Sequence, residues 1–180
     1  MNGEVWLAEI LDQYRYRKEQ CERAVAQVSD EQLFDTVGRI PLPIAAQMKH
    51  LGGNHSSRWR DFLTTDGEKA DRNRDGEFVV EGETPESIWA IWEEGWRLTF
   101  ETLESLTTDD LEKTVTIRGE PMTVVQAIQR NLTHLAYHTG QIVSLARHVA
   151  GESWQTLSIA PGDSEAHNEK MRERWGDWGG

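Results

Sequence analysis

The sequence has a single cysteine and lacks any long apolar run. Cys21 has no second cysteine to pair with, so no intrachain disulfide forms, as is typical of proteins in a reducing cytosol. No stretch approaches the roughly 18 consecutive apolar residues that a membrane-spanning helix needs. The N-terminal stretch MNGEVWLAEILDQYRYRK carries early acidic residues and no apolar block long enough for a signal peptide. We therefore expect a cytoplasmic protein.

Basic residues are scarce relative to acidic ones. The chain has 19 Lys and Arg against 31 Asp and Glu, which gives a formal net charge of −12 at pH 7. Such a surface repels phosphate backbones and anionic lipid headgroups. The only concentrations of basic residues, RYRK at 15–18 and RNR at 72–74, are short. We therefore expect neither nucleic acid nor a membrane as a partner.

Apolar residues recur at three- and four-residue intervals along most of the chain, which is typical of amphipathic helices. The length of 180 residues fits one domain, spanning residues 1–180, that is able to bury a sizeable core. The spacing predicts long helices over about 4–28, 43–63, 85–106 and 124–150. The sequence therefore predicts an all-α protein, a four-helix bundle with a small β-hairpin between the third and fourth long helices.

Local signals support these boundaries. Thr84-Pro85-Glu86 offers an N-cap, a proline at the first helical position and an early acid. Thr123 with Gln126 predicts a capping box at the start of the fourth long helix, which should end at Gly151.

Two segments lie outside the long helices. Residues 113–123 alternate in polarity and turn at Arg118-Gly119-Glu120, which predicts the hairpin. Residues 152–180 are predicted to form an irregular tail, with a short helix near 164–175.

Two histidines lie four residues apart in the fourth predicted helix. His134 and His138 therefore project from one face, close enough for one metal ion, and Gln141 continues that face. Neutral imidazole is a preferred ligand of Zn, Ni, Cu and Fe. The alternative is a pair of core or interface histidines satisfied by backbone carbonyls. Leu135 replaces the glutamate of the H-E-x-x-H pattern, which excludes that class of metalloprotease.

The second predicted helix offers two candidates for a third ligand. His55 lies on the apolar stripe with Leu51, whereas His50 lies in a polar row with Gln47 and Asn54. Periodicity places His55 toward the core and His50 on a polar seam. A metal site in a bundle needs polar groups and an opening to solvent, so the spacing leaves both histidines open.

Two other features give less support to a site. The stretch DRNRDG at 71–76 matches the opening of a calcium loop, but Gly82 stands where the bidentate glutamate belongs. A lone cysteine such as Cys21 is more often a small buried hydrophobe than a nucleophile.

Three stretches resemble the DinB-like superfamily, in particular a bacterial branch of it: MKHLGGNHSSRWRDFLTTDGEKADRNRDGEF, EEGWRLTFETLESLTTDDLEKTVTIRGE and HLAYHTGQIV…WQTLSIAPGDS. The likeness runs from the first predicted helix to about Asn168. It implies a four-helix bundle that binds a divalent metal, Zn or Ni first, through three histidines. Matched to that pattern, the ligands are His50 in KHL and His134 and His138 in HLAYHTGQ. His55 has no counterpart, which implies a packing or lining residue.

The resemblance also implies a chemistry. Three histidine ligands leave a coordination position open, as in catalytic zinc sites. Characterised relatives in the superfamily include S-transferases and isomerases that use bacillithiol, mycothiol or glutathione. The resemblance thus implies a thiol-dependent S-transferase in which the metal activates a low-molecular-weight thiol toward a small-molecule substrate, in a homodimer. Asn54, Tyr137 and Gln141 are the predicted supporting residues around the ligands.

Two rival functions stay open. One is a non-catalytic metal-binding or stress-response module. The other is metal-dependent hydrolysis, for which Asp61 and Glu94 are the candidate general bases.

Overall fold

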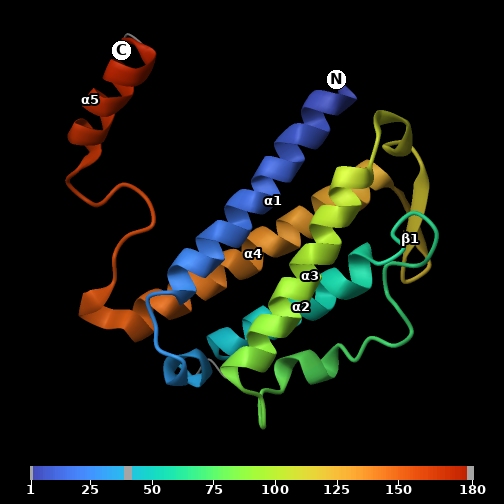
Figure 1. The fold of residues 1–180 in the computed structure, drawn as a ribbon, viewed down its shortest axis with the longest axis horizontal. Helices are drawn as coiled ribbons and strands as arrows, with labels where there is room; N and C mark the ends of the chain where they lie inside the picture. Colours follow the sequence, from blue (N-terminus) through green and yellow to red (C-terminus); the bar gives the residue numbers. More distant parts are fainter. Residues whose placement is uncertain (1, 39–41, 178–180) are drawn as a thin grey trace.

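The computed structural model describes residues 2–38 and 42–177, and these form a mostly helical protein (Figure 1). The described residues contain five α-helices: α1 (Gly3–Val25), α2 (Ile44–Trp59), α3 (Pro85–Ser105), α4 (Val124–Ala150) and α5 (Ser164–Trp175). Strands β1 (Thr114–Ile117) and β2 (Glu120–Thr123) pair antiparallel between α3 and α4. None of the described helices is long and apolar enough to cross a membrane.

The four long helices pack on one another, whereas α5 lies apart. Helix α2 packs along α3 and also contacts α4, and α1 packs along α4 and contacts α3 (Figure 1). Helix α5 follows an extended segment and has no buried residue, which explains why apolar periodicity gave only a weak signal for it. The sequence predicted a short helix near 164–175, and α5 spans these residues. The last three residues of the predicted tail lie outside the described residues.

The predicted capping signals form as expected. Thr84 accepts the Ser87 amide, and the Ser87 hydroxyl accepts the Thr84 amide, so α3 begins with a reciprocal capping box. Thr123 and Gln126 make the same pair of contacts at the start of α4. Each box satisfies two amides that a helix start would otherwise leave without partners.

The second helix is shorter than the predicted span of 43–63. Pro43 is its N-cap, in an extended conformation. At the other end Arg60 is also extended, and Asp61 has a φ of 50°. That left-handed conformation turns the chain, and the Asp61 carbonyl accepts the amides of Thr64 and Thr65. The apolar stripe continues past the turn, so periodicity alone overestimated the helix.

Aromatic side chains fill the core between the helices. Tyr14, Trp59, Trp92 and Trp96 are fully or almost fully buried. Tyr14 contacts Trp59 and Trp96 edge to face, with ring centroids 5.8 and 6.4 Å apart. Aromatic rings bury large apolar areas, and this compensates for the modest hydrophobic fraction of the chain.

Helices α2 and α3 approach unusually closely at two glycines. A Cβ atom on Gly95 would lie 2.6 Å from the carbonyl oxygen of Gly52, and one on Gly52 would lie 2.5 Å from that of Ile91. Gly53 faces the loop after α2, where a Cβ atom would lie 2.5 Å from Glu77 Oε1. Gly52 therefore lets the backbone of α3 contact the backbone of α2, and Gly53 lets the Glu77 side chain contact it.

The close approach predicts opposite effects for two alanine substitutions. Gly95→Ala should lower the free energy of unfolding by about 1–3 kcal/mol, because the new methyl group forces the α2 backbone away. Gly140→Ala on α4 has no atom within 4 Å of the added Cβ and should raise it by about 0.5–1 kcal/mol through helix propensity. Urea denaturation measures both. Equal stabilisation by the two substitutions would contradict the packing described here.

Candidate metal centre

Three histidines from two helices converge at the α2–α4 contact. His50 lies on α2, and His134 and His138 lie one turn apart on α4. One ring nitrogen from each lies within 4.8 Å of the other two. His50 Nε2 and His134 Nε2 lie 3.2 Å apart. The structure thus brings together the three histidines that the resemblance to DinB-like proteins selected as ligands.

Hydrogen bonds fix two of these rings. His50 Nδ1 donates to Glu77 Oε2 at 2.8 Å, and His138 Nδ1 donates to Gln47 Oε1 at 2.7 Å. A carboxylate and an amide oxygen only accept, so each neutral ring carries its proton on Nδ1. Each Nε2 of a neutral ring then carries the lone pair, and that of His50 faces His134 Nε2. This is the tautomer in which a histidine ligates a metal through Nε2.

The surroundings also keep the two α4 histidines uncharged. Burial, and then the charges that His138 and His50 would carry, lower the pKa of His134 to about 3. Burial and then His50 lower the pKa of His138 to about 4, against a smaller opposing effect of Gln141. Near pH 7 both rings are therefore neutral, which is the form that binds metal. Three imidazole nitrogen donors at this spacing fit a divalent cation.

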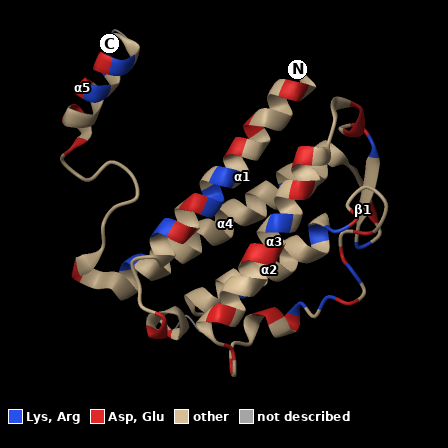
Figure 2. Cartoon of the chain, in the orientation of Figure 1, with Lys and Arg blue, Asp and Glu red and all other residues tan. Residues whose placement is uncertain are grey.

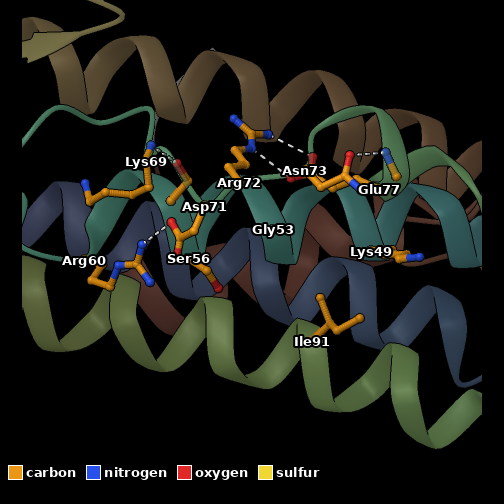
Figure 3. A pocket seen from close by; sticks show the side chains of 12 residues that line it. Lys49, Gly53, Ser56, Arg60, Lys69, Asp71, Arg72, Asn73, Glu77 and Ile91 are labelled. Carbon is orange, nitrogen blue, oxygen red and sulfur yellow. Dashed lines mark hydrogen bonds and ion pairs between the residues drawn. The ribbon is translucent and has the colours of Figure 1, made fainter.

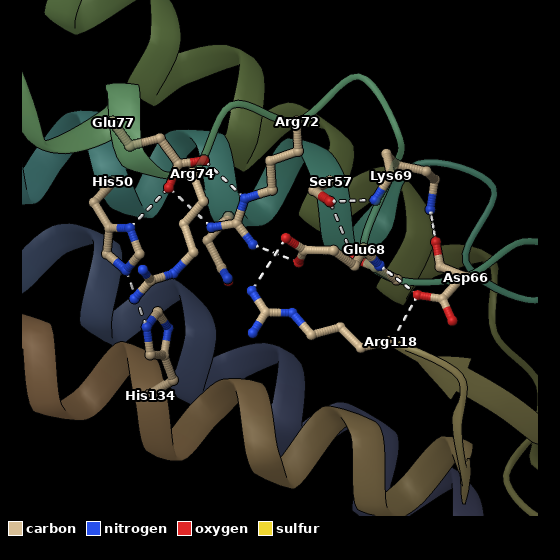
Figure 4. Close-up of polar contacts among 12 residues, drawn as sticks. His50, Ser57, Asp66, Glu68, Lys69, Arg72, Arg74, Glu77, Arg118 and His134 are labelled. Atoms are coloured by element: carbon tan, nitrogen blue, oxygen red, sulfur yellow. Dashed lines mark hydrogen bonds and ion pairs between the residues drawn. The ribbon is translucent and has the colours of Figure 1, made fainter.

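Glu77 is held in place by a second hydrogen-bond partner. Arg72 donates from Nε to Oε1 at 2.8 Å and from Nη2 to Oε2 at 2.9 Å, so Glu77 lies between Arg72 and His50 (Figure 4). Burial opposes ionisation of Glu77, but Arg72 and His50 outweigh it and lower its pKa. Phe78 stacks on the His50 ring with centroids 4.6 Å apart. The short helix Asp75–Phe78 thus supports His50 from one side.

The predicted supporting residues lie around the cluster in different ways. Asn54 is buried and accepts from Asn131 Nδ2 at 3.0 Å. Tyr137 is 64% exposed and meets the His138 ring edge to face, with centroids 5.1 Å apart. Gln141 has a buried amide oxygen without a hydrogen-bond partner among the described residues. Of the three, Asn54 and Tyr137 make no hydrogen bond to a cluster histidine within the described part of the chain.

His55 lies apart from the cluster, in the core. Its side chain is fully buried, and neither ring nitrogen has a hydrogen-bond partner among the described residues. The ring packs edge to face on Trp96, with centroids 4.8 Å apart. Burial is the main reason that the pKa of His55 falls to about 3. The position agrees with a packing role, whereas helical periodicity had left His55 open as a ligand.

The other candidate ligands and bases lie elsewhere. Asp61 is exposed in the turn after α2, and Glu94 is exposed on α3, where it binds Arg97. In the stretch that resembles a calcium loop, Asp71 binds Arg60 at 2.6 Å and Asn73 accepts the Gly76 amide. Within residues 2–38 and 42–177, the three histidines are the one group of potential ligand residues close enough to share an ion.

Two residues that orient the ligands were not expected from sequence. Gln47 lies one turn before His50 on the same polar row, and that position was its only signal. Glu77 lies in a loop that sequence reasoning treated as polar surface, yet it is 7% exposed. Nothing in the local pattern of a loop indicates burial, because burial there depends on the tertiary contact with Gly53.

These features define a mostly helical protein whose three clustered histidines are able to hold a metal ion. A family model described as "Protein of unknown function (DUF1572)" matches residues 2–163. The chain therefore belongs to this family, and the match covers α1 to α4 and ends just before α5. No curated protein and no solved structure matches the chain.

The support of His50 by Glu77 predicts a graded loss of metal affinity. Glu77→Gln should weaken zinc binding by about 10- to 100-fold, because the amide is a weaker acceptor for His50 Nδ1–H than the carboxylate. Competition with a chromophoric chelator measures the change. The matched control is Glu83→Gln, which removes a carboxylate that binds Lys49 and Ser87 in the same region. Equal zinc affinity of the two variants would contradict the orienting role of Glu77.

Proposed function

We propose that the protein is a DinB-like four-helix bundle that binds a divalent metal, zinc or nickel, through His50, His134 and His138. The convergence of three ring nitrogens within 4.8 Å is the observation that supports this most strongly. The hydrogen bonds from His50 to Glu77 and from His138 to Gln47 add support, because they hold two rings in the ligating tautomer.

We further propose that the site serves a thiol-dependent S-transferase. Three protein ligands leave a position open for an outside molecule. When bound there, a divalent cation lowers the pKa of a thiol toward neutral pH. The resemblance to DinB-like transferases supports this reading, together with a small-molecule second substrate, a homodimer and a cytoplasmic location.

The chain itself offers no reactive thiol for this chemistry. Cys21 is fully buried, and burial raises the pKa of its thiol to about 12, so it stays protonated at neutral pH. The thiol must then come from a small molecule. Hydrolysis gains no comparable support, because Asp61 and Glu94 lie away from the cluster and Glu77 is occupied by Arg72 and His50.

The metal assignment predicts different outcomes for four alanine variants. His50→Ala and His138→Ala should each take up less than a tenth of the zinc bound by wild type, because two imidazoles bind zinc weakly. His55→Ala should keep its metal and lose stability, and His148→Ala, on the exposed end of α4, should change neither. Elemental analysis of tag-free protein gives the stoichiometry. Full zinc occupancy in His138→Ala would refute the proposed ligand set.

The thiol assignment has a spectroscopic test that does not depend on knowing the second substrate. Addition of glutathione to cobalt-loaded protein should produce a sulfur-to-cobalt charge-transfer absorption in the near ultraviolet. S-methylglutathione, which has no free thiol, should not produce it. A cobalt spectrum that is indifferent to both compounds would remove the thiol chemistry and leave a non-catalytic metal-binding module.

A further inference from the structure

A small cavity opens directly beside the histidine cluster. It has a volume of about 150 Å³, and His50 and His134 form part of its wall. Five arginines also line it: Arg58, Arg72, Arg74, Arg118 and Arg130. Acidic and basic residues are interspersed along α1 and on the loop after α2 (Figure 2). In a chain of net charge −12, a cavity lined by five arginines and one glutamate is a local reversal of sign.

Arg58 is the most unusual of the five. It is 8% exposed, and its Nη1 is buried without a hydrogen-bond partner among the described residues. It forms no ion pair with any described residue. Burial, and then the charges of Arg130 and Arg72, lower the pKa of Arg58 to about 10, against smaller opposing effects of Glu68 and Asp66, so it is still charged at pH 7. A buried charge without a partner is unfavourable unless an outside anion supplies one.

The acids near the cavity compensate only part of this charge. Glu68 is the one carboxylate among the described lining residues, and it binds Arg72 at 2.8 Å and Arg118 at 3.1 Å (Figure 4). Outside the cavity, the buried Glu77 binds Arg72, so Arg58 is the one arginine of the five without an acidic partner among the described residues. The exposed Asp75 lies 3.8 Å from Arg74, and the exposed Glu120 binds Arg130 at 2.8 Å. Exposed pairs of this kind contribute little free energy and exchange readily for another anion.

A larger cavity beside the same loop has a different lining. It has a volume of about 330 Å³ and lies over Gly53 and Ser56 (Figure 3). Among its cations, Arg60 binds Asp71 and Lys49 binds Glu83. None of the cluster histidines lines it, and neither does Arg58. The buried Arg58 and the metal-centre histidines thus meet at the smaller cavity.

We propose that the arginine-lined cavity is an anion-binding subsite, and that the small molecule used at the metal centre carries an oxyanion such as a carboxylate or a phosphate. Guanidinium groups bind both through paired N–H donors. A volume of about 150 Å³ holds one such group rather than a whole substrate. The anion-binding subsite is inferred from the residues that line the cavity. Its assignment to the substrate of the metal centre rests on the proposed function.

Titration calorimetry of metal-free protein with inorganic phosphate and with succinate tests the subsite. Wild type should bind at least one of the two, and which one it prefers identifies the chemistry. Arg130→Gln and Arg118→Gln should each weaken binding by about fivefold, since each removes a half-exposed charged donor. Arg97→Gln is the matched control, because Arg97 is about as exposed as Arg130 and is likewise paired with glutamate, but on α3. It should bind like wild type.

Repeating the titration with zinc-loaded protein separates the two proposals. Arginine-dependent anion binding in a protein that takes up no metal would uphold the subsite and reject the metal function. Normal zinc uptake without anion binding would reject the subsite alone. Anion binding that requires zinc and is equal in Arg130→Gln and Arg97→Gln would also overturn the subsite, because the anion would then contact the metal instead.

Discussion

Hydrogen bonds at two imidazole Nδ1 atoms orient the centre on which the proposed function depends. His50 donates to Glu77 and His138 donates to Gln47, so both rings turn their Nε2 lone pairs toward one region between α2 and α4. Burial keeps His134 and His138 neutral by lowering the pKa of each well below 7. The His50 and His138 rings are therefore oriented before any ligand arrives, which reduces the free energy that metal binding must spend on ordering them.

The loop between α2 and α3 connects this centre to the rest of the site. Its Glu77 packs against Gly53 and supports His50. Its Asp66 accepts the amides of Arg118 and Gly119 at the hairpin turn, both at 2.8 Å, which fixes the loop to the hairpin. The same loop thereby sets the position of the metal ligands and of the arginine-lined cavity. An anionic group in that cavity would place its reactive end beside the histidines.

Features that depend on neighbouring residues could be predicted from sequence, and those that depend on tertiary contacts could not. The long helices, the capping boxes and the hairpin follow from local spacing and turn chemistry, as does the His134–His138 pair. The choice of His50 rather than His55 as the third metal ligand required the resemblance to DinB-like proteins, because helical periodicity left both histidines as candidates. The early end of α2, the burial of Glu77 and the clustering of five arginines depend on how one irregular loop folds back on α2 and the hairpin.

X-ray absorption at the zinc edge tests the convergence of three imidazoles on one cation most directly. We expect three imidazole nitrogens at about 2.0–2.1 Å from the zinc ion, together with one further oxygen or nitrogen ligand that does not come from a protein side chain. His50→Ala should lose one imidazole from that shell, and His55→Ala should leave the spectrum unchanged. A wild-type spectrum with two or fewer imidazoles, or one that responds to His55→Ala and not to His50→Ala, would contradict the central claim.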